Sequence, residues 1–414
     1  MSQAVNNYQQ KIEFFLQKYL KNYFIVIFIT TITAAFYGYL INHQWKIGDW
    51  LINYQGGMIR RGLLGELVYQ LSYITNINPG IYILALQILL YGIFLFFSYH
   101  LLKKQRNLLP YSILVVSPFI FTFQINDLVG GFRKEIIYIA LLAFITWAAN
   151  VKEHKSFEKY FYITLFLYPA VILTHEMLAI FLPYLLVVYV SVTALNRKKL
   201  LLLSLLLLPN IISFLTAMHY SGEANQIKAI LNSLSNANYV IGNGAITWLN
   251  KSASFGINKV VEQLTTKNYI FYLLNIIFAS VAFIPLYQKI QDITRNKLAL
   301  LLIITSMIGS IGLFLVAIDW GRLIYIHLIS IFFLLFIPTP NRNISYSWFL
   351  KEFSKKNIII FFVAYSLFWS IPHAGSVLKK TFRQPNFISF LVPYFKVTRY
   401  YTKTLDKKLE SFDK

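Results

Sequence analysis

The sequence of 414 residues contains no cysteine, which excludes disulfide bonds, a thiolate nucleophile and thiolate metal ligands. It is also short of acidic residues, with 16 Asp and Glu against 38 Lys and Arg, and charged residues make up only 13% of the chain. Soluble domains carry about 25% charged residues. The shortage therefore argues against a soluble globular protein.

The sequence is correspondingly rich in apolar residues. They make up 57% of the chain, aromatic residues make up 17%, and the mean hydropathy is +0.56. These values indicate a polytopic membrane protein. The net charge of +22 would suggest nucleic acid in a soluble chain, but most Lys and Arg here lie in short segments between apolar runs. That distribution sets membrane topology, so we expect no nucleic-acid partner.

The spacing of these runs predicts an all-α fold with about eleven transmembrane helices and five regions. Residues 1–22 are expected to form a cytoplasmic amphipathic helix, and no cleavable signal peptide is evident. Residues 23–218 and 269–378 form the expected transmembrane core, 219–268 an extracytoplasmic insertion, and 379–414 a basic C-terminal tail. The expected spans include residues 23–41, 81–102, 110–124, 160–174, 177–194, 200–217, 269–286, 298–318, 323–338 and 358–372.

Eleven spans would leave the basic tail outside, against the positive-inside tendency. A twelfth crossing could use only Phe387 to Phe395, which contains Pro393 and covers about half of the hydrocarbon thickness of about 30 Å. A re-entrant or interfacial segment fits these residues better, and the side on which the tail lies stays open.

A polar segment rich in glycine follows the first apolar run. It holds Asp49, the adjacent Arg60 and Arg61, and four glycines between residues 56 and 65. Glycines let backbone N–H groups approach an anion, which the arginines would neutralise. This segment therefore reads as the floor of a reaction site. The alternative is a loop whose arginines contact lipid phosphate groups.

Further polar residues fall on the same, outer side of the expected topology. Arg133, His175 and Arg322 each lie at the start of a span, where the helix dipole adds positive charge, so a dianionic ligand would suit the place. Span ends are also where charges cost least, which is the alternative explanation. The set comprises Asp49, Arg60, Arg61, Asp127, Arg133, Lys134, Glu135, His175, Glu176, Asp319, Arg322 and His373.

Among these residues, His175 is a candidate general base because imidazole titrates near neutral pH, and Glu176 could tune it. A structural, hydrogen-bonded histidine explains the same residue equally well. Asp319 could pair with Arg322 on one helix face, and Asp127 could cap a helix. The pair His175-Glu176 is no zinc-protease motif, because Ala179 stands where a second histidine ligand is needed. We expect no metal and no cofactor.

Two short motifs resemble those of the Wzy/EpsG-type bacterial polysaccharide polymerases. They are Gly131-Phe132-Arg133-Lys134-Glu135 before an apolar span, and Thr174-His175-Glu176 opening an apolar run that reaches Pro183. Lys134 stands where the family usually has Gln. The likeness covers mainly residues 127 to 190. A second resemblance is to GT-C glycosyltransferases, which place acids in the first two outer loops, as Asp49 and Asp127 are placed here.

Both resemblances imply a glycosyltransferase that uses polyprenyl-linked sugars on the outer face of the bacterial inner membrane. The cytoplasmic N-terminus is expected separately, from the amphipathic helix over residues 1–22. The preferred function is polymerisation of polyprenyl-diphosphate-linked repeat units into a surface polysaccharide; the alternatives are a GT-C enzyme that adds a single sugar and a flippase for lipid-linked sugars. The implied partners are a lipid-linked donor and acceptor, membrane lipids, and chain-length regulator and flippase proteins.

The resemblances also imply roles for particular residues. The catalytic base would be one of four candidates, and cationic side chains would bind the phosphate and stabilise charge on the leaving group. The candidate bases are His175, Asp49, Asp127 and Glu176. The candidate phosphate-binding residues are Arg60, Arg61, Arg133, Lys134 and Arg322.

The expected topology can be tested by labelling single cysteines, because the native chain has none. In intact spheroplasts, an impermeant maleimide should label cysteine introduced at Gln55 or Val240, which are expected outside. It should not label cysteine at Gln105 or Lys198, which are expected inside. The opposite pattern would reverse the arrangement.

Overall fold

The computed structural model describes residues 2–338, 356–375, 377–382 and 386–412. It is 77% helical and has no strand among these residues, which confirms the all-α expectation. The helices are α1 (Ser2–Leu40), η1 (Gly48–Leu51), α2 (Leu63–Thr75), α3 (Pro79–Lys103), η2 (Leu109–Tyr111), α4 (Ser112–Val116), α5 (Phe123–Asn126), α6 (Glu135–Val151), α7 (His154–Thr174), η3 (Glu176–Phe181), α8 (Leu182–Val192), α9 (Arg197–His219), α10 (Ala224–Asn236), α11 (Ala253–Thr265), α12 (Asn268–Val281), η4 (Ile284–Leu286), α13 (Tyr287–Arg295), α14 (Lys297–Val316), α15 (Trp320–Leu334), α17 (Lys356–Leu367), α18 (Val377–Thr381) and α19 (Asn386–Phe412).

The described part of the chain contains four helices that are long and apolar enough to cross a membrane. The bent pair of α12 with η4 and α13, whose axes differ by 49°, raises this number to five if it forms one span. The protein is thus membrane-embedded, but the expected count of about eleven spans is not supported. The four helices are Gln10–Leu40 within α1, α3, α9 and α14.

The difference in count arises because several expected spans are short helices in the protein interior. Helix α15 has 15 residues and would extend about 22 Å at 1.5 Å per residue, against a hydrocarbon core of about 30 Å. Twelve of its residues are buried, whereas only four of the 23 residues of α9 are buried. An interior helix contacts protein along its length, so it need not match the thickness of the lipid.

Proline breaks two of the other expected spans. In the segment 110–124, α4 ends at Val116, and Ser117, which precedes Pro118, has an extended backbone with ψ 149°. In the segment 269–286, α12 ends at Val281, and Pro285 lies in the short helix η4, which begins at Ile284 and after which the chain changes direction. Apolar composition alone does not reveal such interruptions.

The two ends of the chain form long helices that lie against each other. The expected surface helix and first span are one continuous helix of 39 residues, α1. Phe387 to Phe395 lies within α19, which packs against α1 and α5 and contains Pro393. Within the basic tail, Arg383 lies outside the described residues.

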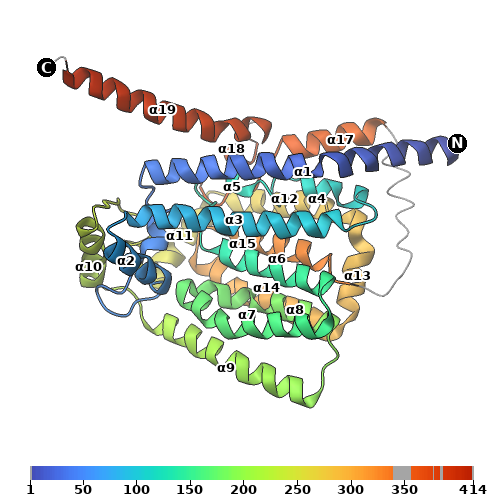
Figure 1. Cartoon of the computed structure of the whole chain (residues 1–414), viewed down its shortest axis with the longest axis horizontal. Coiled ribbons are helices and arrows are strands. Elements are labelled where there is room, and N and C mark those ends of the chain that lie inside the picture. The colour runs from blue at the N-terminus through green and yellow to red at the C-terminus, as the bar shows by residue number, and fades with distance from the viewer. Residues whose placement is uncertain (1, 339–355, 376, 383–385, 413–414) are drawn as a thin grey trace.

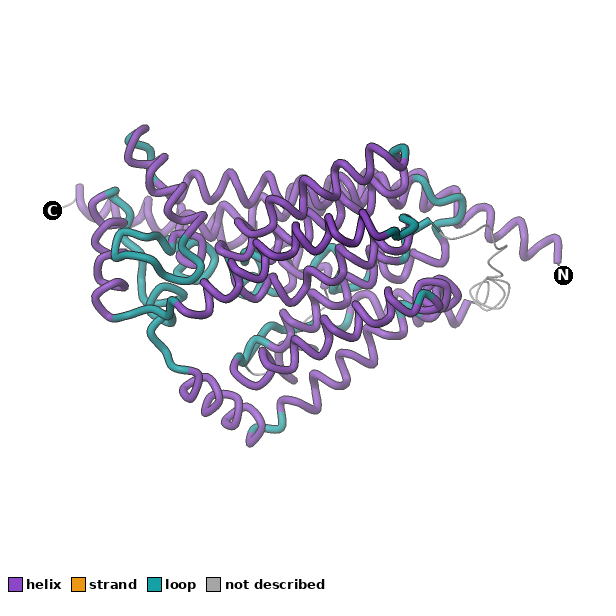
Figure 2. Tube along the Cα trace, turned by 90° about the horizontal axis from the view of Figure 1, so that it is seen from below, coloured by secondary structure: helices purple, strands orange, loops and turns teal. Residues whose placement is uncertain are grey.

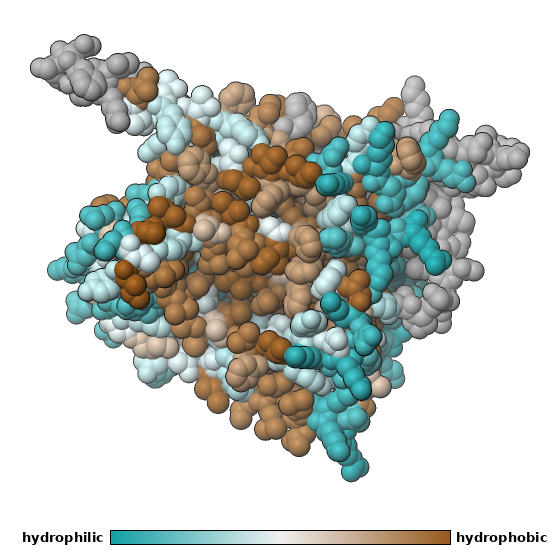
Figure 3. Space-filling model, in the orientation of Figure 1, coloured by the Kyte–Doolittle hydropathy of each residue, from teal (hydrophilic) through white to brown (hydrophobic). Residues whose placement is uncertain are grey.

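The helices run side by side in a bundle (Figure 1), and the surface at each end of the bundle is polar (Figure 3). A space-filling view shows an apolar band between these two polar ends, as expected for a protein surrounded by lipid (Figure 3). The N-terminal end of α1 and the turns at 103–109, 151–154 and 192–197 lie at one end. Contacts link these turns, because Lys104 donates to the carbonyl of Asn150 and Lys199 pairs with Glu158 at 2.5 Å.

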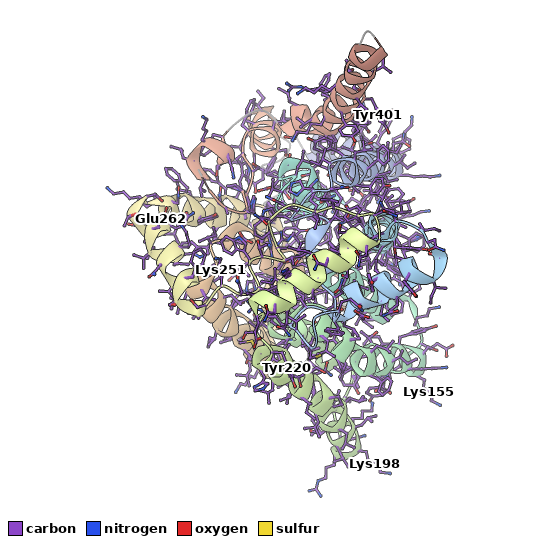
Figure 4. All side chains as sticks on the ribbon, turned by 90° about the vertical axis from the view of Figure 1, so that its left-hand side faces the viewer. Lys155, Lys198, Tyr220, Lys251, Glu262 and Tyr401 are labelled. Atoms are coloured by element: carbon purple, nitrogen blue, oxygen red, sulfur yellow. The ribbon has the colours of Figure 1, made fainter. Side chains whose placement is uncertain are left out.

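The other end carries the larger group of loops (Figure 2). There, the insertion with α10 and α11 covers the segment that follows α1. Asn53 Nδ2 donates to Ser233 Oγ at 3.0 Å, and Gln226 Nε2 donates to the carbonyl of Met58 at 3.1 Å. Figure 4 looks directly onto this end and labels Tyr220, Lys251 and Glu262 of the insertion. We call this end the insertion end.

Helix α2 approaches the same segment so closely that only glycine fits at one position. A Cβ atom built on Gly65 would lie 1.9 Å from the carbonyl oxygen of Ile52, whereas Gly312 in α14 has nothing within 4 Å. We expect Gly65→Ala to force α2 away and to lower the melting temperature in detergent by several degrees, at a cost of about 1–3 kcal/mol. The control Gly312→Ala should leave the melting temperature unchanged or raise it slightly. Equal melting temperatures for the two variants would contradict this packing.

Candidate functional site

Charged side chains from four separate parts of the chain meet below the insertion end. They come from the segment before α2, the start of α6, the junction of α7 with η3, and the start of α15. We call them the charge cluster, and its members are Asp49, Arg61, Arg133, Lys134, Glu135, His175, Glu176, Asp319 and Arg322. Seven of these nine were predicted as site residues from the sequence, and the fold brings those seven together.

Arg61 and Glu176 form an ion pair with three short contacts between the guanidinium and the carboxylate. Arg61 Nε lies 2.9 Å from each carboxylate oxygen of Glu176, and Nη2 lies 2.5 Å from Oε1. Burial alone would raise the pKa of Glu176, but the charge and hydrogen bonds of Arg61 outweigh it and lower the pKa below 4.5. Glu176 is therefore an anion that neutralises Arg61.

The backbone around Arg61 is unusual for a residue with a side chain. Its φ is +68°, in the left-handed region that favours glycine. Lys134 Nζ donates to the carbonyl of Arg61 at 2.9 Å and to that of Thr174 at 3.1 Å. Lys134 thereby joins this loop to the end of α7, and burial lowers its pKa to about 8. Its described bonds go to backbone carbonyls, so it acts as a structural link between two walls of the site.

Asp49 and Arg133 form a second pair, with a gap of 3.4 Å between Oδ2 and Nε. Arg133 also lies over the ring of Trp45, at 5.1 Å from its centroid. Asp49 is completely buried, and neither of its oxygens has a hydrogen-bond partner. Burial raises the pKa of Asp49, but Arg133 and the nearby Lys134 and Arg61 lower it further, so the net shift is downward.

His175 lies between two carboxylates. Its Nε2 is 3.9 Å from Glu135 Oε1, its Nδ1 is 3.7 Å from Glu176 Oε2, and neither nitrogen has a hydrogen-bond partner. Glu135 pairs in turn with Arg322, which also binds Asp319 at 2.7 Å. His175 is only 1% exposed, and burial holds its pKa well below 6.5, assisted by surrounding cations. The imidazole is therefore neutral and enclosed.

Two predicted site residues point elsewhere. The backbone N–H of Arg60 donates to the carbonyl of Tyr220 at 3.0 Å, and its Nη2 donates to that of Leu249 at 3.3 Å, so Arg60 faces the insertion. Asp127 Oδ2 accepts hydrogen bonds from the backbone N–H and Nδ1 of His373, both at 2.7 Å. Its Oδ1 accepts the N–H of Gly130 at 2.8 Å. Asp127 thus holds two loops together beside the charge cluster.

A small pocket, which encloses about 20 Å³, borders the cluster. Its polar lining consists of Arg133, Glu135 and Arg322 together with Gly130 and Gly131. Its apolar and aromatic lining includes the stacked rings of Phe123 and Tyr325, whose centroids are 4.1 Å apart. The other lining residues are Tyr91, Phe132, Ile136, Ile139 and Ile326. The pocket therefore combines charged and apolar lining residues.

The cluster is electrically balanced. Its four cations, Arg61, Arg133, Lys134 and Arg322, face four carboxylates, and His175 is neutral. Buried charges are stable only when paired, so this balance is expected of a region that excludes water. An anionic ligand would consequently share these cations with the carboxylates, and the guanidinium groups that line the pocket are the ones it could reach.

Sequence reasoning noticed Glu135 and Asp319 but did not include them among the site residues. Both are the direct partners of Arg322. Glu135 could have been assigned to the site from the sequence, because a carboxylate in the first turn of an apolar helix requires a cation as partner. His373 was also noticed without a role, and no spacing in the sequence links it to Asp127, which lies 246 positions earlier.

Among the described residues, no group of three or more histidine, aspartate or glutamate side chains could hold a metal ion. No family model, no curated protein and no solved structure matches the chain. The function must therefore be inferred from the geometry of the site.

Acidification tests whether His175 is neutral in the folded protein. An unfolded histidine takes up a proton near pH 6.5, whereas the pKa of buried His175 lies well below that value. The stability that depends on the neutral ring is complete above about pH 6.5 and is lost as the pH falls, by up to about 1.4 kcal/mol per pH unit. His175→Gln should therefore reduce the fall in melting temperature between about pH 6.5 and pH 5.

The measurement is thermal unfolding in detergent at a series of pH values. Part of the slope should remain in the variant, because burial also lowers the pKa of His43, to about 4. The control His219→Gln changes an exposed histidine and should keep the wild-type profile. A His175→Gln protein with an unchanged slope would mean that the folded state carries a charged imidazole.

Proposed function

We propose that this chain is a membrane glycosyltransferase that consumes a saccharide carried on polyprenyl phosphate or diphosphate. In the form we favour, it joins lipid-linked repeat units into a surface polysaccharide on the outer face of the bacterial inner membrane. The observation that carries the proposal is the mixed lining of the pocket, in which Arg133 and Arg322 occur together with aromatic and aliphatic side chains. A phosphate attached to a prenyl chain presents the same combination of charge and apolar surface.

The two arginines supply positive charge and hydrogen-bond donors, which stabilise a departing phosphate. Breaking the bond between sugar and phosphate leaves negative charge on the phosphate oxygens, and a planar guanidinium group can donate two parallel hydrogen bonds to them. Arg133 Nε and Arg322 Nε are both buried without a hydrogen-bond partner. Arg61 and Lys134 are not among the residues that line the pocket, and they are bonded to Glu176 and to backbone carbonyls, so we assign them to holding the site in shape.

The surface of the bundle suits a lipid-linked donor and acceptor. Helix α9 exposes a row of large apolar side chains, including Leu201, Leu205 and Leu215. Such a surface is solvated by lipid tails, among which a prenyl chain would lie. The proposed partners are these lipid-linked saccharides and membrane lipids, together with the chain-length regulator and flippase proteins that polymerisation would require.

The small size of the pocket favours a second form of the same chemistry. The enclosed space is about 20 Å³, enough for about one water molecule, so its lining must move apart to admit any saccharide. One sugar ring and a phosphate require less movement than an oligosaccharide repeat unit. Addition of a single sugar from a polyprenyl-phosphate donor is therefore the second candidate.

A flippase for lipid-linked sugars receives less support. Transporters place ionisable residues near the middle of the membrane, commonly at the interface of two repeated halves. Here the charge cluster lies toward one end of the bundle, and the sequence has no internal repeat. This arrangement suits chemistry at one membrane surface.

Deletion of the gene in its own organism distinguishes the three functions. Loss of a polymerase should leave single lipid-linked repeat units and no long polysaccharide, while loss of a single-sugar transferase should leave repeat units that lack one sugar. Mass spectrometry of extracted lipid-linked saccharides measures both. Complete repeat units retained on the cytoplasmic side would favour a flippase, and an unchanged saccharide profile would contradict all three proposals.

Substitution of Arg133 tests the role of the pocket cations. Arg133→Ala should reduce transfer by about 100-fold or more, because it removes charge stabilisation that grows in the transition state. Arg133→Lys should recover only part, since an ammonium group lacks the planar fork. The assay follows transfer in isolated membranes supplied with lipid-linked saccharides extracted from the deletion strain. The control is Arg295→Ala, an exposed arginine paired with Asp292, which should transfer normally. Full activity of Arg133→Ala would remove this residue from the mechanism.

A further inference from the structure

His373 presents an oriented imidazole beside the pocket. It lies in the segment between α17 and α18, and its Nδ1 is 2.7 Å from Asp127 Oδ2. The same carboxylate oxygen accepts the backbone N–H of His373 at 2.7 Å. Because a carboxylate only accepts hydrogen bonds, Nδ1 carries the proton in this pair. In the neutral ring, Nε2 then has a free lone pair that can accept a proton.

Close contacts place His373 beside residues that line the pocket. A Cβ atom built on Gly130, which lines the pocket, would lie 2.5 Å from His373 Cβ. The N–H of Gly321 donates to the carbonyl of His373 at 3.2 Å, and the next residue, Arg322, also lines the pocket. Glycine at both positions lets the segment approach this closely. His373 therefore adjoins Gly130 and the start of α15, which carries Arg322.

The ring of His373 is accessible where the other candidate bases are not. Its side chain is 15% exposed, and Nε2 makes no hydrogen bond within the described part of the chain. By contrast, His175 is 1% exposed and Asp49 is completely buried. Glu176 is occupied by Arg61. A general base must come within hydrogen-bond reach of the proton that it removes, which favours His373 on geometric grounds.

We propose that His373 is the general base of the transfer reaction and that Asp127 is its positioning residue. This inference rests on the proposed glycosyltransferase function. His373 Nε2 takes the proton of the acceptor hydroxyl as its oxygen forms a bond to the anomeric carbon. The bond from that carbon to the phosphate oxygen breaks, and its electron pair leaves with the polyprenyl phosphate or diphosphate beside Arg133 and Arg322. The imidazolium then returns its proton to water.

Asp127 makes this assignment chemically coherent. Its carboxylate fixes the ring through Nδ1, so that Nε2 faces away from Asp127, and its negative charge stabilises the imidazolium formed during the reaction. Its second oxygen binds the backbone N–H of Gly130 at 2.8 Å, so the carboxylate is itself held in place. An acid at position 127 thus contributes to catalysis through the histidine and does not act as the base.

Chemical rescue separates a base from a structural histidine. His373→Ala should reduce transfer by about 100-fold or more, and added imidazole, which can occupy the vacated site, should restore a substantial part of the rate. Asp127→Asn should also slow transfer, but imidazole should not restore it, because the ring is still present. The membrane assay with lipid-linked saccharides from the deletion strain serves for all variants. Melting temperatures show whether each variant is folded.

A control variant weakens the anchoring of the backbone at His373 while it keeps the imidazole ring. Tyr272 OH donates to the backbone carbonyl of His373 at 3.1 Å, so Tyr272→Phe removes an anchor and leaves the imidazole in place. We expect near wild-type transfer from this variant. If folded His373→Ala transfers at the wild-type rate, or loses activity that imidazole does not restore, the base assignment is wrong while the glycosyltransferase proposal stands. If the wild-type membranes transfer nothing from the extracted donor, the proposed function itself fails.

Discussion

The need to neutralise buried charge governs the insertion end of this protein. Four cations and four carboxylates meet there with little access to water, and the cost of removing an ion from water is recovered only when an opposite charge lies beside it. Each pair joins different parts of the chain: Arg61 with Glu176, Arg133 with Asp49, and Arg322 with Glu135. The ion pairs therefore hold the loop after α1, the start of α6, the end of α7 and the start of α15 in one arrangement.

This arrangement also explains why the interior helices are short. Helices α6 and α15 begin at the charge cluster, and the loops and the insertion cover this cluster. The two helices therefore start deeper in the bundle than α3 and α9, which reach its polar surface. The first turn of α6 supplies Glu135 to the cluster and that of α15 supplies Arg322, and many of their remaining residues are buried in the core. A helix that starts inside the bundle does not need the full length that crosses the hydrocarbon core of a membrane. The site and the short helices are thus two consequences of one recessed layer of charge.

Much of this organisation was predictable from the sequence, and the reasons for the failures are physical. Apolar composition identified a helical membrane protein, and rare charges at the ends of apolar runs identified Arg61, Arg133, His175 and Arg322, because such charges require partners. The number of spans was overestimated, since an interior helix such as α15 has the same composition as one that faces lipid. The pairing of Asp127 with His373 was not predictable, because hydrophobic periodicity contains no information about contacts across 246 positions.

The balance of charge also limits how the site can bind an anion. Arg133 and Arg322 are each paired with a carboxylate, so any attraction between a phosphate and these arginines weakens their pairing with Asp49, Glu135 or Asp319. Asp49, which has no hydrogen bond to either oxygen, depends most on its arginine, so sharing Arg133 with phosphate would raise the pKa of Asp49. Phosphate binding is then coupled to the protonation of a buried acid. Removal of the leaving group would restore the original pair, so the ion pairs that stabilise the empty site also favour release of the product.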